Sequence, residues 1–264
     1  MPSSHRPRKR FGQNFLIDRS VLYQIADAVA PQLGDNLLEI GPGQGALTAV
    51  LLTRIKHLTA VEIDRDLVAY LQRHFTAAQL TLYSEDILRF NLSRIAQDNA
   101  AFRIVGNLPY NITTPLLFHL LASHVAIADM HFMLQREVAD RLVATPGSEQ
   151  YGRLGIMVSY HCQVERLFEV PPEAFSPPPK VTSAVVRLVP HRTPPVALHH
   201  LKSLEQVVTT AFSQRRKTVR NSLKNLLNET HFSAANIDPG ERPERLSLVQ
   251  FAALANQLNP GEIS

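Results

Sequence analysis

The stretch Asn36-Leu37-Leu38-Glu39-Ile40-Gly41-Pro42-Gly43-Gln44-Gly45 decides how this chain folds. It begins as a short apolar run typical of a buried strand, passes through three glycines and leads into a helical apolar pattern at 46–52. Glycines allow a sharp turn and let the backbone lie directly against a ligand, because no Cβ intervenes. The order of strand, glycine loop and helix predicts an open α/β sheet with a ligand site beyond the carboxyl end of the strand.

The pattern of strand followed by helix continues along the chain. Strand-like runs alternate with amphipathic helical patterns, and this alternation predicts a parallel sheet covered on both faces. Two later alternating runs, separated by a proline-rich stretch, predict closing antiparallel strands. The predicted strands are 37–40, 58–63, 80–83, 102–105, 128–134, 164–170 and 183–189, and the helices are 19–30, 46–52, 67–75 and one that starts at Thr114.

A proline-rich segment, 190–195, is typical of a linker. Helical patterns follow it at 201–212, 219–227, 234–237 and 246–258. We therefore predict two domains, a Rossmann-like catalytic domain at residues 1–194 and a small all-helical domain at residues 195–264.

Composition restricts the class of protein. The chain has 264 residues with 45% hydrophobic content, which is enough for a full core, and a net charge of +4 that is compatible with a polyanionic partner. Its single cysteine, Cys162, leaves no internal disulfide, and no apolar run approaches the length of a membrane span. The histidines show no metal-ligand spacing, so we predict no metal. These features predict a soluble cytoplasmic protein, and nothing in the sequence suggests an obligate dimer.

The glycine spacing indicates the class of ligand. The spacing is Gly-x-Gly-x-Gly, whereas dinucleotide sites favour Gly-x-Gly-x-x-Gly, and Glu39 precedes the glycines. A carboxylate at that place would repel a pyrophosphate but attract a sulfonium or an amino group. This favours S-adenosyl-L-methionine over NAD, and the alternative is a glycine-rich turn without a ligand.

Acids follow two of the later predicted strands. Glu62 ends the strand after the glycine loop, where a carboxylate can accept hydrogen bonds from ribose hydroxyls. Asp86 follows the next strand and is placed to receive the exocyclic amine of the cofactor's adenine, with Glu85 as a competing assignment. A solvated acid at a strand end is the structural alternative for both.

The tetrapeptide Asn107-Leu108-Pro109-Tyr110 follows the fourth predicted strand. The side-chain oxygen of Asn107 and the carbonyl of Leu108 can accept from a planar amine, Pro109 donates no competing N–H, and Tyr110 offers a ring on which a base can stack. An Asn-Pro turn with a core tyrosine is the alternative. Downstream of the glycine loop, the tetrapeptide predicts methylation of the exocyclic amine of a base.

Further motifs extend these two into a family pattern. In order they are 11–16 (Phe-Gly-Gln-Asn-Phe-Leu), 39–45, 107–110, 135–139 (Gln-Arg-Glu-Val-Ala), 175–181 (Phe-Ser-Pro-Pro-Pro-Lys-Val) and 212–217 (Phe-Ser-Gln-Arg-Arg-Lys). Together they resemble the KsgA-type small-subunit (16S) ribosomal RNA adenine N6,N6-dimethyltransferases over nearly the whole chain.

The resemblance implies dimethylation of two adjacent adenosines near the 3′ end of 16S rRNA in the small ribosomal subunit, with a role in small-subunit biogenesis. It implies that Tyr110 and Phe175 sandwich the target base. From the residues alone, we would place Phe175 as a core cap beneath a rigid proline loop. The cofactor contacts that the resemblance implies are Asn14, Leu16, Gly41, Glu62, Asp86 and Asn107.

Basic residues are the candidates for contacts with RNA phosphates, and we expect the helical domain to bind the RNA. A charge run is otherwise a solvated face. The candidates are Arg215, Arg216, Lys217 and Arg220, together with Arg6, Arg8, Lys9 and Arg10 near the N-terminus.

Three other functions compete with this interpretation. One is a large-subunit rRNA adenine methyltransferase of the antibiotic-resistance type, which shares similar motifs. A second is a ribosome-assembly factor whose binding matters more than its catalysis. The third is an NAD-linked dehydrogenase, against which the glycine spacing and Glu39 argue.

Overall fold

The computed structural model describes residues 13–96, 101–123, 125–214 and 216–258, and these residues divide into two compact units. One unit comprises the described residues up to Ala139 together with Glu165–Pro190. The other comprises Asp140–Val164 and the described residues from His191 onward. Residues 140–164 thus group with the C-terminal helices, although they precede the linker in sequence. The functional division at residue 194 stays a prediction.

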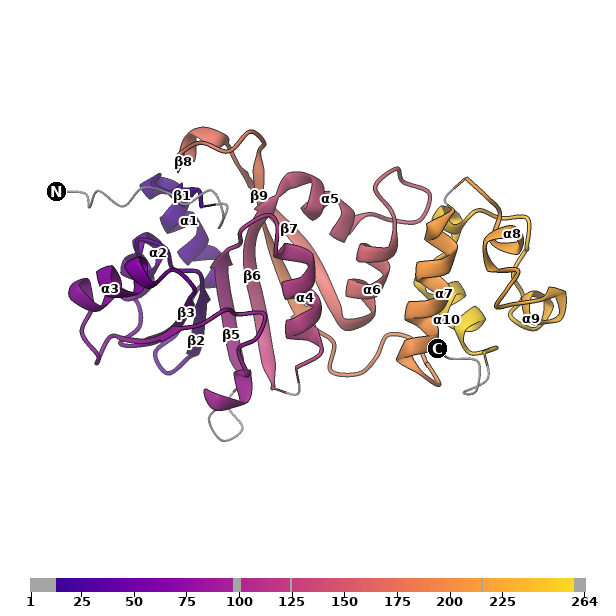
Figure 1. The fold of residues 1–264 in the computed structure, drawn as a ribbon, viewed down its shortest axis with the longest axis horizontal. Coiled ribbons are helices and arrows are strands. Elements are labelled where there is room, and N and C mark those ends of the chain that lie inside the picture. The colour runs from indigo at the N-terminus through magenta and orange to yellow at the C-terminus, as the bar shows by residue number, and fades with distance from the viewer. Residues whose placement is uncertain (1–12, 97–100, 124, 215, 259–264) are drawn as a thin grey trace. The chain divides into compact units, whose positions relative to one another are not determined.

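A seven-stranded sheet forms the centre of the first unit, in the order β4-β3-β2-β5-β6-β9-β7 (Figure 1). The strands from β4 to β6 are parallel, and β9 pairs antiparallel with β6. This confirms the predicted parallel sheet with a closing antiparallel strand. The bounds are β2 (Asn36–Ile40), β3 (Leu58–Glu62), β4 (Leu80–Ser84), β5 (Phe102–Asn107), β6 (Ile127–Gln135), β7 (Cys162–Val170) and β9 (Ser183–Pro190).

Helices α1 (Arg19–Val29) and α2 (Ala46–Leu51) belong to one hydrophobic cluster with the sheet. In this cluster Leu22 and Ile25 of α1 join Val105 and Met133 of the strands. Because side chains alternate along a strand, the neighbours of Val105 and Met133 point to the opposite face. Figure 1 draws α4 (Thr113–Leu121) in front of the sheet, on the side of β6 away from β5, and α3 (Arg65–His74) follows β3. These four helices confirm the predicted helices at 19–30, 46–52 and 67–75 and the one expected to start at Thr114.

A two-stranded ribbon lies outside the main sheet. Its strands are β1 (Phe15–Leu16) and β8 (Phe175–Ser176), which pair antiparallel with Leu16 opposite Phe175. The pairing joins the N-terminal motif to the proline-rich loop, which are far apart in the sequence.

The remaining helices show where sequence patterns were misleading. Two were not predicted, α5 (Arg136–Val143) and α6 (Arg153–His161). Gly155 interrupts the apolar pattern of α6, yet a Cβ there would lie 2.5 Å from the carbonyl oxygen of Arg141, so close backbone approach requires the glycine. The other helices are α7 (Leu201–Ser213), α8 (Val219–Leu223), α9 (Glu229–Ala234) and α10 (Leu248–Ala255).

The helix predicted at 234–237 was wrong, because α9 ends where that helix was expected to begin. The side chain of Asn228 accepts from the backbone N–H groups of Thr230 and His231 and so starts the helix earlier. Asn236 has a left-handed φ of 55°, which prevents the helix from continuing.

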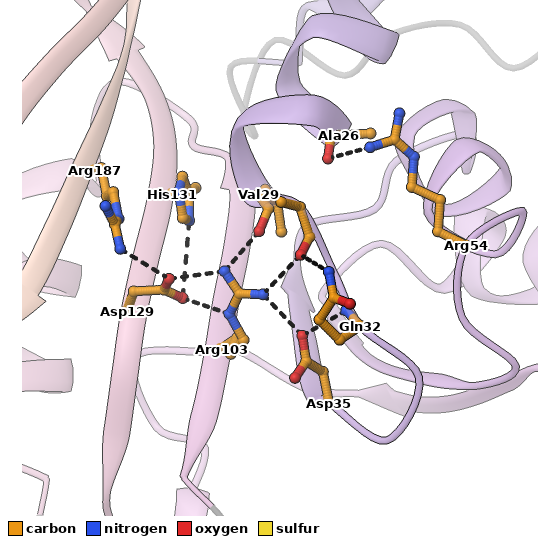
Figure 2. Close-up of polar contacts among 10 residues, drawn as sticks. Ala26, Val29, Gln32, Asp35, Arg54, Arg103, Asp129, His131 and Arg187 are labelled. Atoms are coloured by element: carbon orange, nitrogen blue, oxygen red, sulfur yellow. Dashed lines mark hydrogen bonds and ion pairs between the residues drawn. The ribbon is translucent and has the colours of Figure 1, made fainter.

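An ion network at the amino end of β5 fastens α1 to the sheet (Figure 2). Arg103 makes two hydrogen bonds to the carboxylate of Asp129 on β6, at 2.9 and 2.8 Å, and one of 2.8 Å to Asp35. The same guanidinium donates to the carbonyl of Val29 at the end of α1, at 2.6 Å. Hydrogen bonds to both carboxylates raise the pKa of Arg103 above its usual value, so its charge is permanent.

We predict that Arg103→Met lowers the free energy of unfolding by about 3 kcal/mol, because the buried Asp129 loses its main partner. Urea unfolding of the two proteins measures this difference. Arg54→Met is the matched control, because Arg54 also donates to a carbonyl of α1, Ala26, but its acidic partner Asp27 is 70% exposed. It should cost about 1 kcal/mol or less. Equal losses in the two variants would contradict the assignment.

Candidate active site

A cavity of about 330 Å³ opens at the carboxyl ends of the central parallel strands. Its walls come from the glycine loop after β2, the acids after β3 and β4, the segment 107–112 after β5, and residues 13–15 of the N-terminal motif. This is the edge of an open α/β sheet at which ligands bind. The structure therefore brings four separately predicted motifs to one cavity.

The glycine loop presents bare backbone to this cavity. Gly41 and Gly43 have φ values of 65° and 59°, in the left-handed region that favours glycine. A Cβ on Gly41 would meet no atom within 4 Å, so the space beside it is open to a ligand. The loop is tied to β3, because Gly41 donates its N–H to the carbonyl of Val61 at 2.9 Å.

Glu62 lies at the end of β3 and is only 5% exposed. One carboxylate oxygen accepts from the N–H of Gly43 at 3.1 Å, and the other accepts from the N–H of Asp64 at 2.9 Å. Burial raises the pKa of Glu62 above its ordinary value, and the backbone donors oppose that rise. Each oxygen can accept a further hydrogen bond, as a ribose diol requires.

The two candidate acids after β4 differ in their surroundings. Glu85 is engaged by Arg94, whose Nη1 lies 2.7 and 2.8 Å from its two carboxylate oxygens. The carboxylate of Asp86 accepts only a local N–H, that of Leu88 at 3.0 Å, among the hydrogen bonds found within the described part of the chain. Both side chains line the cavity. The engagement of Glu85 favours Asp86 as the acceptor for an adenine amine.

The charge of the cavity separates the two cofactor classes. Its lining includes the acids Glu62, Glu85 and Asp86, and none of the described residues that line it is a lysine, arginine or histidine. A pyrophosphate would find only repulsive charges here, whereas a sulfonium, an adenine amine and ribose hydroxyls find acceptors. The residues therefore fit S-adenosylmethionine and do not fit NAD.

The Asn-Leu-Pro-Tyr segment is held at three points. The side-chain Nδ2 of Asn107 donates to the carbonyl of Asn14 at 3.0 Å, and the N–H of Leu108 donates to the carbonyl of Met133 at 3.0 Å. The hydroxyl of Tyr110 lies 2.8 Å from the Oγ of Ser183 on β9. Burial raises the pKa of this half-buried phenol, which stays neutral. The segment is thus rigid before any substrate binds.

Two of the catalytic and cofactor-binding candidates lie outside this cavity. Phe175 is 3% exposed and packs in the hydrophobic cluster under β1, which is the core role that the residues alone favoured. It does not line the cavity, whose lining includes Tyr110. Leu16 pairs with Phe175 and lines a neighbouring cavity of about 560 Å³, which shares Gly41 and Asn107 with the first. The other candidates, which are Asn14, Gly41, Glu62, Asp86, Asn107, Leu108 and Tyr110, line the first cavity together.

Glu39 lies on β2 directly before the glycine loop and is 2% exposed. The hydroxyl of Thr48 on α2 donates to it at 2.6 Å. Burial raises the pKa of Glu39 to about 7, and the neighbouring charge of Glu62 adds to the rise. The spacing of Glu39 and Thr48 could have suggested this contact, since the first turn of α2 lies next to the end of β2. The contact was not predicted from the sequence.

The basic candidates lie in the second unit where they are described. Arg216, Lys217 and Arg220 are exposed, and Arg220 forms an ion pair of 2.8 Å with Glu229. Arg215, Arg6, Arg8, Lys9 and Arg10 lie outside the described residues. Within the described ranges, no group of three or more His, Cys, Asp or Glu side chains could hold a metal ion, and no helix is long and apolar enough to cross a membrane.

Comparison with known proteins places these features in one family. A family profile described as ribosomal RNA adenine dimethylase matches residues 4–259. The ribosomal RNA small subunit methyltransferase A of Alcanivorax borkumensis is 52% identical over 97% of this chain and 91% of its own. A dimethyladenosine transferase from Plasmodium falciparum superposes with a TM-score of 0.76 at 24% identity, over 91% of this chain and 95% of its own. The 23S rRNA methyltransferase ErmE superposes with a TM-score of 0.70 at 26% identity, over 93% of this chain and 99% of its own.

The buried Glu39 carboxyl predicts a specific dependence of stability on pH. Between about pH 4.5, the ordinary pKa, and about pH 7, the unfolded chain loses this proton while the folded chain keeps it. The contribution of Glu39 to the free energy of unfolding therefore falls as pH rises through this window. We predict that Glu39→Gln, which removes the ionisation, is more stable than the parent protein by roughly 2–3 kcal/mol at pH 8.

Urea unfolding at pH 5, 6, 7 and 8 measures this difference, which should grow with pH and level off above 7. Glu173→Gln is the control, because Glu173 is an exposed carboxylate, and its difference from the parent should stay flat. A flat difference for Glu39→Gln would contradict the prediction.

Proposed function

Because this chain belongs to the ribosomal RNA adenine dimethylase family, it is an S-adenosylmethionine-dependent rRNA adenine dimethyltransferase, and we propose that its substrate is 16S rRNA. The reaction is dimethylation of the N6 amine of two adjacent adenosines near the 3′ end, in the small subunit in the cytoplasm. The 52% identity to a protein named for the small subunit supports this choice of RNA. The observation that carries the proposal is the Asn107–Tyr110 segment, which opens into the same cavity as the glycine loop and its acids.

When bound, S-adenosylmethionine supplies an electrophilic methyl group on its sulfonium. Glu62 would accept from the ribose hydroxyls of the cofactor, and Asp86 would accept from the amine of its adenine. The Oδ1 of Asn107 and the carbonyl of Leu108 accept from the target amine, whose lone pair is otherwise delocalised into the ring. These two acceptors draw the amine towards tetrahedral geometry and hold its nitrogen in line with the methyl group. Most of the catalysis is therefore positioning. The proton can leave after the positive charge has formed, so no strong base is required.

Tyr110 provides the surface on which the target base stacks. Its hydroxyl is held by Ser183, so the ring has little freedom to turn away. Stacking on an aromatic ring contributes about 1–3 kcal/mol per base. Phe175 as the second wall of the base stays a prediction, since this side chain is buried in the core.

The target adenosine lies in structured RNA and must swing out of its stack to reach the cavity. We propose that the C-terminal helical domain holds the RNA through phosphate contacts from Arg216, Lys217 and Arg220, which are exposed and are not among the residues that line the acidic cavity. Arg215 shares this assignment from its sequence. Binding to the assembling subunit also gives the protein its role in small-subunit biogenesis.

The direct test is methyl transfer from labelled S-adenosylmethionine to purified small subunits that lack the modification. Large subunits are the control, and nuclease mapping identifies the product. Dimethyladenosine in the small subunit alone is the expected result. Label in the large subunit would move the protein to the resistance-type methyltransferases, and cofactor binding without any transfer would favour the assembly-factor function. An Asn107→Ala variant that still supports subunit maturation would show that binding is the larger part of that role.

Two substitutions at Tyr110 separate the stacking surface from the hydroxyl. We predict that Tyr110→Ala lowers kcat/KM for the subunit by roughly 5–150-fold, which corresponds to the loss of about 1–3 kcal/mol of stacking. Tyr110→Phe keeps the ring and loses only the contact with Ser183, so its kcat/KM should stay within about fivefold of the parent. Single-turnover rates measure both. Equal losses in the two variants would show that the hydroxyl, and not the ring, is what matters.

A further inference from the structure

The N-terminal segment Gln13–Leu16, which we call the strap, runs across the cofactor end of the sheet and touches three separate elements. The side-chain Nε2 of Gln13 donates to the Oδ2 of Asp64 after β3, at 3.1 Å. The carbonyl of Asn14 accepts from Asn107 at the end of β5. Leu16 pairs with β8. The strap is thus part of the cavity wall, and contacts with the segment after β3, with β5 and with β8 hold it there.

The contact between the strap and Asn107 has a consequence for the amine clamp. A side-chain amide presents a donor on one side and an acceptor on the other, and the two halves have almost the same shape. Only the Oδ1 of Asn107 can accept a hydrogen bond from the target amine. The carbonyl of Asn14 can accept a hydrogen bond only from Nδ2 of Asn107. If the amide were turned over, Oδ1 would lie 3.0 Å from this carbonyl, and two acceptors would face each other. The strap therefore selects the one amide orientation in which Oδ1 remains to accept from the amine.

The position of the strap depends on Asp64. This side chain is fully buried, and its Oδ1 accepts from the N–H of Asp66 at 3.0 Å, as the N-cap of α3. Its Oδ2 holds Gln13. Asp64 is therefore immobile, and Gln13 links the strap to a fixed point one residue before Asn14.

The ring of Phe15 fixes the strap against the glycine loop. A Cβ on Gly43 would lie 3.1 Å from this ring, so the ring rests directly on the bare backbone of the loop. Gly43 is in turn held by Glu62. The glycine loop, the end of β3 and the strap thus form a continuous set of contacts that leads to the carbonyl of Asn14.

We propose that the strap is the positioning device for the catalytic amide, with Gln13 and Asp64 as positioning residues that act through the carbonyl of Asn14 on Asn107. This inference rests on the proposed function, because it concerns the same amine clamp. Gln13 and Asp64 do not themselves contact the reacting atoms in this assignment. Their effect is on the rate of methyl transfer more than on cofactor affinity.

The test removes the Gln13 side chain and leaves the N-cap of α3 intact. In Gln13→Ala we expect kcat for methyl transfer to unmodified small subunits to fall about tenfold, while KM for S-adenosylmethionine changes by less than about threefold. Gln32→Ala is the matched control, because the exposed side chain of Gln32 makes only a local contact to the carbonyl of Ala30, and the kinetics of this variant should equal those of the parent. Thermal unfolding of both variants checks the fold.

A double-mutant cycle then asks whether Gln13 acts through Asn107. In single-turnover measurements with Asn107→Ala, the additional change Gln13→Ala should alter the rate by less than about twofold, because the amide that the strap orients is gone. Rate losses that multiply would overturn the inference. So would an unchanged kcat in Gln13→Ala, or a rise in KM alone, which would make Gln13 a plain cofactor contact. If the parent protein transfers no methyl group, the proposed function fails and the inference falls with it.

Discussion

The buried carboxylate of Glu62 holds the cofactor end of this protein together. Its two oxygens accept from the backbone of Gly43 and of Asp64, so one side chain ties the glycine loop to the end of β3 and to the start of α3. The loop can adopt its left-handed backbone only because glycine has no Cβ, and that bare backbone is what a ligand and the ring of Phe15 can approach closely. The cavity, the strap and the amine clamp all depend on this arrangement.

This end of the sheet is costly for stability. Glu39 and Glu62 are both buried, and burial raises the pKa of each. Ionisation of either carboxyl therefore costs more free energy in the folded protein than in the unfolded chain. The ion network of Arg103 lies at the opposite edge of the sheet, on the neighbouring strands β5 and β6. Arg103, at the start of β5, is paired with two carboxylates and with the end of α1 (Figure 2), whereas Asn107, at the end of β5, belongs to the amine clamp. The strand β5 thus carries the ion network at one end and the segment proposed to bind the target amine at the other.

Sequence reasoning was accurate where a residue pattern has one physical interpretation. The alternation of apolar runs with helices predicted the parallel strands, and the glycine loop predicted the edge of the sheet at which the cavity lies. It failed at α5 and α6, where Gly155 is required by a close approach to the backbone of Arg141 that no local pattern reveals. It also misplaced α9, because the cap at Asn228 and the left-handed Asn236, rather than the apolar pattern, set the limits of that helix.

The family, the cofactor class and most of the cavity could be predicted from the sequence, since Gly41, Glu62, Asp86 and Asn107 end or follow strands whose carboxyl ends must meet at one edge of a parallel sheet. Only the tertiary structure decided which side chains hold these residues in place. Arg94 engages Glu85, which favours Asp86 as the acceptor in our proposal, and the amide of Asn107 donates to the carbonyl of Asn14 across 93 residues of chain. The same packing placed Phe175 in the core. Hydrogen bonds between residues so distant in sequence depend on how the elements pack, and no periodicity or spacing along the chain encodes that directly.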